Sequence, residues 1–166
     1  MTIALVTPVF SQAIWKLGVD GSFGTAARWN PASVPNQFDN VVIKKEGHYK
    51  VSIASDYTIN NLTIGNSATY SQGVTLEVSH SVLQVNGGKI LNTGVIQLDK
   101  IGGATDSSLL IGGDTTLTGG GSYGGLYLGG PSGGGASSIG TVPGFAGTAT
   151  FKIINNLIGG SGQIGD

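Results

Sequence analysis

The residues of this sequence that could perform acid–base chemistry are few and scattered. Glu77 is the middle residue of an apolar-x-apolar triplet, and Gln97 takes the corresponding place 20 positions later. Two carboxylates about 5 Å apart on adjacent strands would suit a retaining glycosidase, but Gln97 is not an acid. Asp56 and Asp99 lie 21 and 22 positions from Glu77, outside the triplets and out of register. The sequence offers no catalytic pair, and we expect no enzyme.

The sequence lacks the residues that a metal site or a phosphate-binding loop would require. His48 and His80 are the only histidines, 32 positions apart, and there is no cysteine. A zinc site would have to recruit a distant carboxylate, so we expect surface histidines. Residues 119–124 fit G-x-G-x-x-G, but the strand-like triplet 126–128 follows where a phosphate-binding loop needs a helix. We therefore expect neither a metal nor another cofactor.

Three large aromatic residues form a possible contact surface. Trp15, Trp29 and Tyr127 could stack against the apolar face of a sugar, because an aromatic ring combines apolar area with a polar tip. The stronger interpretation of the two tryptophans is structural: they close the N-terminal end of the core. A surface glycan is the partner that the first interpretation implies.

Short strands must position all of these residues. Six triplets carry an apolar residue on each side of a middle residue, which is the alternation typical of a strand. They are Leu62-Thr63-Ile64, Leu76-Glu77-Val78, Leu83-Gln84-Val85, Ile96-Gln97-Leu98, Leu109-Leu110-Ile111 and Leu126-Tyr127-Leu128. Their first residues advance in two interleaved series by 21 positions (62 to 83) and 20 positions (76 to 96). This length is typical of β-strand repeats. The sequence predicts an all-β parallel β-solenoid of roughly six coils, with the flanking residues inward and the middle residues outward.

Composition supports a neutral, turn-rich protein and excludes several partners. Only 10% of the 166 residues are charged, 30 are glycine, and the net charge is −1. Arg28 and seven lysines provide no basic face for nucleic acid. No apolar run reaches the 18 or so residues of a membrane helix, so we expect no membrane insertion. The absence of cysteine leaves the compartment open and slightly favours the cell exterior.

The pattern divides the chain into four parts. We expect an N-terminal cap segment over 1–40, regular coils over 41–128, a Gly-rich loop over 129–147 and a terminal coil over 148–166. Asp39 and several asparagines are expected at turns, where they can satisfy free backbone groups. The Gly-rich loop is a candidate contact surface. Both ends are expected to assemble with other strands through Ile3, Leu5, Val9, Phe10, Phe151, Ile153 and Ile164.

Several segments resemble bacterial surface proteins that carry β-strand repeats. Trp29-Asn30, Pro35 and the run 39–43 are similar to the start of such proteins, while 61–65, 83–88, 92–98, 109–121 and 156–165 are similar to their coils. Autotransporter-type passengers and filamentous-haemagglutinin-like adhesins belong to this class. The resemblance implies a right-handed parallel β-helix, export to the cell surface or exterior, and a non-enzymatic role as scaffold or adhesin.

Two further functions remain open. A carbohydrate-active β-helix enzyme, such as a phage tailspike, would need acids grouped with a basic partner on one face. A glycan-binding module would use Trp15, Trp29 and Tyr127. For the scaffold, the expected partners are other copies of the chain or the remainder of a longer parent polypeptide, since each unpaired strand edge is a template for another strand.

Overall fold

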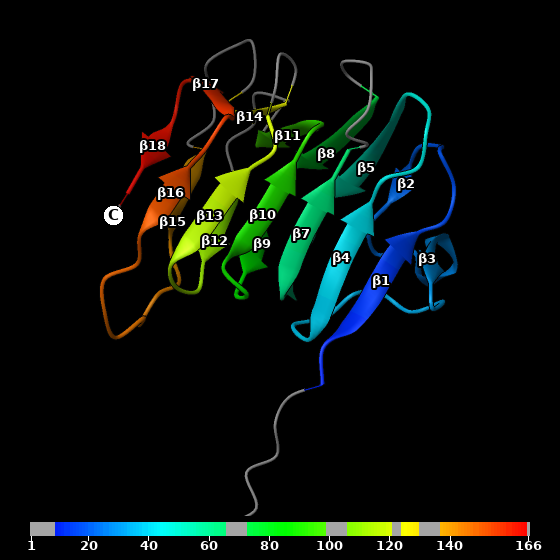
Figure 1. Cartoon of the computed structure of the whole chain (residues 1–166), viewed down its shortest axis with the longest axis horizontal. Coiled ribbons are helices and arrows are strands. Elements are labelled where there is room, and N and C mark those ends of the chain that lie inside the picture. The colour runs from blue at the N-terminus through cyan, green and yellow to red at the C-terminus, as the bar shows by residue number, and fades with distance from the viewer. Residues whose placement is uncertain (1–8, 66–72, 99–105, 121–123, 130–136, 166) are drawn as a thin grey trace, which may run out of the picture.

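The structure is a computed structural model that describes residues 9–65, 73–98, 106–120, 124–129 and 137–165. Its described part is all-β, with a single 3-10 turn at Ala26–Arg28. The strands form three sheets, called A, B and C (Figure 1). All strand pairs are parallel except the pair of β1 with β3. The predicted fold class is confirmed at this level.

Each sheet gathers strands from the whole length of the chain. Sheet A contains β1 (Ser11–Trp15), β3 (Trp29–Asn30), β4 (Asp39–Ile43), β7 (Asn61–Ile64), β10 (Lys89–Asn92), β13 (Thr115–Thr118) and β16 (Phe151–Ile153). Sheet B contains β2 (Gly21–Ser22), β5 (Tyr49–Ile53), β8 (Val74–Val78), β11 (Val95–Leu98), β14 (Gly125–Leu128) and β17 (Leu157–Gly160). Sheet C contains β6 (Tyr57–Ile59), β9 (Val82–Val85), β12 (Ser108–Ile111), β15 (Ser138–Thr141) and β18 (Gln163–Ile164).

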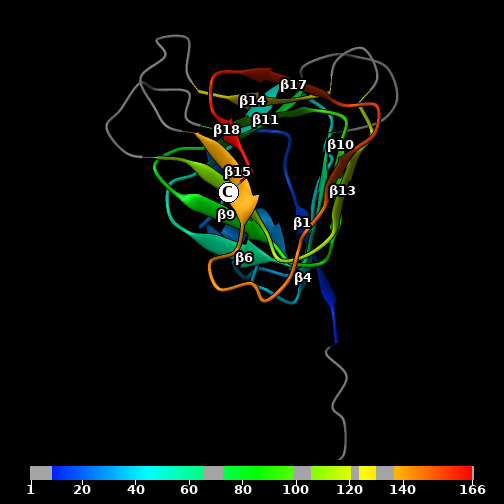
Figure 2. The ribbon, with the colours of Figure 1, turned by 90° about the vertical axis from the view of Figure 1, so that its left-hand side faces the viewer.

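The strand order follows one rule from β4 onward. Consecutive strands pass from sheet A to B to C, and neighbours within a sheet are three strands apart in the chain. Figure 2 shows the three sheets arranged around a common interior, with the strand colours advancing along each sheet in chain order. This topology is compatible with a β-solenoid.

Alternation within each strand builds the core. The flanking residues of all six predicted triplets are buried, among them Leu62, Leu83 and Leu109, and side chains from all three sheets form one cluster. Successive side chains of a strand point to opposite faces, so the middle residues lie on the outside. They are partly exposed, as predicted, with the exception of Glu77, which is buried.

The predicted step of about 20 residues is wrong for one of the two series. Leu76 pairs with Ile96, 20 positions on, as expected. Leu62 pairs with Ile90, 28 positions on, while Leu83 belongs to another sheet. The physical reason is that strand pairing fixes the register of the strand residues but not the number of residues between strands. Connections between them differ in length, so no single period describes the chain.

Two predicted segment descriptions also need correction. The segment 129–147 is not loop throughout: β15 lies inside it, pairs with β12, and buries Ile139 in the core. Within 1–40, β1 and β2 already pair in parallel with β4 and β5. This segment is therefore not a separate cap, because it contributes strands to sheets A and B. Very short strands carry little pattern, and the Gly-rich surroundings of β15 hid it further.

The predicted turn role is confirmed for Asp39 and for some of the asparagines. Asp39 accepts hydrogen bonds from the backbone N–H of Asn36 at 2.8 Å and from the hydroxyl of Ser11. Asn60 and Asn86 lie between strands, whereas Asn61 and Asn92 lie within β7 and β10, and Asn66 is outside the described residues. The side-chain amides of Asn60 and Asn61 donate to Asn40 Oδ1 at 2.9 and 2.8 Å, which links β7 and the residue before it to β4.

Replacing Ile96 with alanine tests the inward–outward assignment. Ile96 is buried between Leu76 and Leu126 of the adjacent strands, so the Ile96→Ala variant should lose about 2–5 kcal/mol of unfolding free energy. The adjacent Gln97→Ala variant is the control and should change it by less than about 0.5 kcal/mol. Urea denaturation measures both. Equal losses would contradict the assignment.

Candidate functional site

The outer face of sheet B carries one polar row that crosses four strands. Strand register aligns Ser52 with Glu77, Glu77 with Gln97, and Gln97 with Tyr127. The predicted pairing of Glu77 with Gln97 is therefore confirmed. The neighbour of Glu77 in this row is thus the amide of Gln97, not a second carboxylate.

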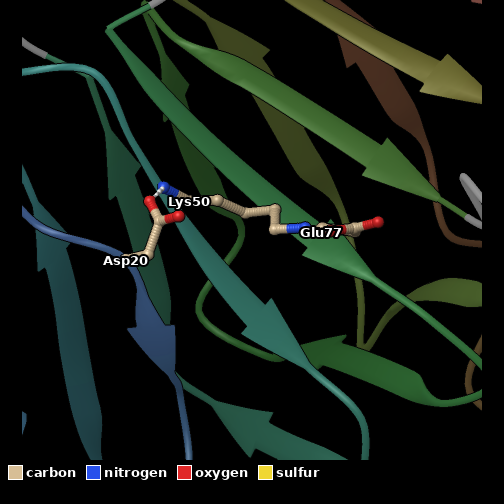
Figure 3. A network of polar contacts seen from close by, with 3 residues as sticks. All are labelled: Asp20, Lys50 and Glu77. Atoms are coloured by element: carbon tan, nitrogen blue, oxygen red, sulfur yellow. Dashed lines mark hydrogen bonds and ion pairs between the residues drawn. The ribbon is translucent and has the colours of Figure 1, made fainter.

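Glu77 is held in an ion pair with Lys50. Lys50 Nζ lies 2.6 Å from Glu77 Oε2, and the exposed fractions of the two side chains are 42% and 4% (Figure 3). The backbone N–H of Lys50 donates to Asp20 Oδ1 at 2.7 Å, which ties this strand to the preceding segment. A carboxylate that is both buried and neutralised is poorly placed to exchange protons with a substrate. We therefore assign Glu77 a structural role.

The three predicted contact aromatics do not form one surface, and that part of the prediction is wrong for the tryptophans. Trp15 and Trp29 are fully buried, with ring centroids 5.0 Å apart in an edge-to-face contact. Phe23 packs on Trp29 at 4.9 Å and accepts a hydrogen bond from its indole N–H. This packing supports the structural interpretation. Burial on this scale leaves no ring face for a ligand.

Tyr127 lies elsewhere, on the outer face of sheet B. Its ring lies against Gly125 and Gly159, where an added Cβ would come within 2.6 and 3.4 Å of ring atoms. Glycine at these two positions lets the ring lie close to the sheet. Tyr127 is half-buried, and its role as a contact residue stays a prediction.

The predicted assembly residues fall into three groups. Ile3 and Leu5 lie outside the described residues. Val9 and Phe10 are exposed ahead of β1. At the other end, Ile153 and Ile164 are exposed and Phe151 is half-buried. Leu157 in β17 is also exposed, and it lies in register with Gly125 on the outer face of sheet B.

The C-terminal end presents an apolar surface with open strand edges. In the part of the chain that the structure describes, β16, β17 and β18 each have one strand neighbour. Between sheets A and C at this end lies an apolar hollow of about 180 Å³, bordered by Ile139, Phe151 and Ile164. Ile164 at this border is exposed and lies in register with buried Ile139, and exposed Ile153 lies in register with buried Leu117. We call this surface, formed by β16–β18 and the hollow, the C-terminal face.

The N-terminal end differs from it. There β3 pairs antiparallel with β1 and takes the edge position of sheet A, and Pro31 follows it directly. A short antiparallel strand followed by proline is a common way to protect a sheet edge. Trp15, Trp29 and Phe23 fill the core beneath it. The two ends of the stack are therefore unequal: the N-terminal end, here called the protected end, has its sheet A edge covered, while in the described chain β2 and β6 remain edge strands of sheets B and C.

In the described ranges, no three His, Cys, Asp or Glu side chains gather to hold a metal ion. Nor does any helix there have the length and apolarity to cross a membrane. The backbone N–H of His80 donates to Ser107 Oγ at 2.9 Å, and this histidine has a φ of 54°, which marks it as a turn residue.

A double-mutant cycle tests the structural role of Glu77. Lys50→Met removes the partner of a buried carboxylate and should cost about 1–3 kcal/mol of unfolding free energy at neutral pH, because Lys50 is partly exposed. Pairing it with Glu77→Gln should recover most of that loss. Lys45→Met, at an exposed lysine of the preceding turn, is the control. Additive losses from Lys50→Met and Glu77→Gln would refute the coupling.

The described surface therefore has three features: an open apolar end, a protected end, and a polar row on sheet B in which the acid, Glu77, is ion-paired with Lys50. Comparison with protein-family models, with curated proteins and with solved structures found no match to this chain.

Proposed function

We propose that the chain is a right-handed parallel β-helix of roughly six coils. The passage of the strands through sheets A, B and C in constant order supports a continuous winding. Six parallel strands of sheet A, β1, β4, β7, β10, β13 and β16, support the number of coils. The right hand follows from the strong preference of parallel crossover connections for that hand.

Its proposed role is that of a non-enzymatic structural protein on a bacterial cell surface or in an extracellular fibre. The low charge, the absence of cysteine and the resemblance to autotransporter passengers and haemagglutinin-like adhesins support this role. The ion-paired, buried state of Glu77 supports a scaffold over a carbohydrate-active enzyme, because that residue was the acid best placed in the repeat.

The observation that carries the proposal is the C-terminal face. Exposed Ile153, Leu157 and Ile164 lie on strands with open edges. Unpaired edges of this kind are templates for further strands, and covering each exposed aliphatic side chain contributes about 1–3 kcal/mol. The proposed mechanism is stacking of a further coil on this face, supplied by a second copy of the chain or by a longer parent polypeptide.

The unequal ends shape this mechanism. Because β3 and the buried aromatic residues protect the N-terminal end, contact between two C-terminal faces fits better than a uniform head-to-tail fibre. Two identical open faces meeting about a twofold axis form a closed interface. Val9 and Phe10, which are exposed before β1, would then contribute little to it.

Analytical ultracentrifugation over a concentration series tests the assembly. We expect reversible association of the wild-type chain and an at least tenfold weaker association of the Ile164→Lys variant, because Ile164 borders the hollow and a buried, unpaired ammonium group there opposes contact. The matched control is Leu17→Lys: Leu17 is 54% exposed, close to the 55% of Ile164, but lies after β1 near the protected end. A wild-type chain that stays monomeric, or equal effects of the two substitutions, would contradict the proposal.

A further inference from the structure

A groove of about 600 Å³ lies near the protected end of the molecule, away from the C-terminal face. One wall is the turn 35–38, which precedes β4, and the other is the start of β6 with Asp56, Tyr57 and Thr58. The groove is shallow and open to solvent, so a ligand would lie along it rather than be enclosed by it. Neither the scaffold role nor the strand pairing requires this hollow.

The first wall presents an aromatic ring on a rigid turn. Phe38 is 46% exposed. Its backbone N–H donates to Asn36 Oδ1 at 3.0 Å, and its carbonyl oxygen accepts from the N–H of Ser11 at 3.0 Å. The buried carboxylate of Asp39 holds the same turn through the N–H of Asn36. The ring is therefore displayed by a turn that is ordered before any ligand arrives, which lowers the entropic cost of binding.

The second wall is fixed just as firmly. The ring of Tyr57 packs on Phe23 with centroids 4.7 Å apart. Asp56 Oδ1 accepts a hydrogen bond from the backbone N–H of Val82 at 2.8 Å, which anchors the start of β6 to β9. In the described chain β6 is the edge strand of sheet C, so the groove runs along an edge that no strand covers.

The lining chemistry selects the ligand. It combines two aromatic residues and a proline with side-chain amides, a hydroxyl and one carboxylate, and it contains no lysine, arginine or histidine. Aromatic faces suit the C–H surfaces of sugar rings, and amides, hydroxyls and carboxylates can donate to or accept from sugar hydroxyls. An anionic ligand would meet Asp56 with no cation to offset the repulsion.

We propose that this groove binds an uncharged saccharide, with Phe38 as the stacking platform and Asp56, Gln37 and Thr58 as hydrogen-bonding groups. An added peptide strand is the less favoured occupant, because β6 has only three residues and offers few backbone hydrogen bonds for strand addition. The site goes beyond the scaffold role and does not depend on assembly through the C-terminal face.

Protein-observed NMR titration of the full chain tests the proposal. The probes are three neutral trisaccharides, cellotriose, maltotriose and chitotriose, together with trigalacturonic acid as a charged one. At least one neutral probe should shift the backbone resonances of 36–38 and 56–58. The Phe38→Ala variant should weaken that binding about tenfold, as expected for the loss of one aromatic stacking contact.

Two further variants sharpen the test. Asp56→Asn keeps an acceptor for the Val82 N–H but removes the charge, so it should alter saccharide affinity while leaving the fold intact. Phe145→Ala removes another exposed aromatic residue, 39% exposed and distant in sequence, and should leave saccharide binding unchanged. The unfolding midpoint of each variant shows whether the fold is intact.

Three results would overturn the inference: no binding of any neutral probe, preferential binding of trigalacturonic acid, or equal effects of Phe38→Ala and Phe145→Ala. Each can occur whether or not the chain self-associates, so failure of the groove proposal and failure of the assembly proposal are distinguishable. Binding that persists in Ile164→Lys would place the two properties at separate sites.

Discussion

In-register pairing of parallel strands is the constraint on which the rest of this structure depends. From β4 to β15 each strand pairs with the strand three places later in the chain, and the pairing brings like side chains together, such as Val51 on Leu76 and Leu83 on Leu109. Burial of an aliphatic side chain contributes about 1.5–3 kcal/mol, and a slip by one residue would turn every such side chain to the outside. The core and the backbone pairing therefore fix one another.

The same constraint explains the outer surface. Once the aliphatic residues are inside, every second residue must be outside, and there the chain places amides and hydroxyls with few charges. Glu77 is the informative exception, since its burial is matched by the nearby ammonium group of Lys50. Asparagine amides also link β4 to β7 and the residue before it, as between Asn40, Asn60 and Asn61. The proposed scaffold role rests on these repeated contacts rather than on one reactive group.

Local alternation made the strands and their inward faces predictable, and the pairing of Glu77 with Gln97 followed from it. Coil length could not be predicted, because the connections differ in length: 65–73 separate β7 from β8, whereas 79–81 separate β8 from β9. Strand β15 was missed because its pattern contains one buried aliphatic residue, Ile139. The saccharide groove was also missed, since its walls come from 35–38 and 56–58, which only the winding of the chain brings together.

Engineered disulfides measure the strand register most directly, since the chain has no cysteine of its own. The structure pairs Gln84 with Leu110, both partly exposed on the outside of sheet C. A constant step of 21 positions would instead pair Gln84 with Thr63. Adjacent strands place Cα atoms within disulfide range, so the Gln84→Cys/Leu110→Cys variant should cross-link on mild oxidation and the Thr63→Cys/Gln84→Cys variant should not. The reverse outcome would contradict the register and with it the account of the fold.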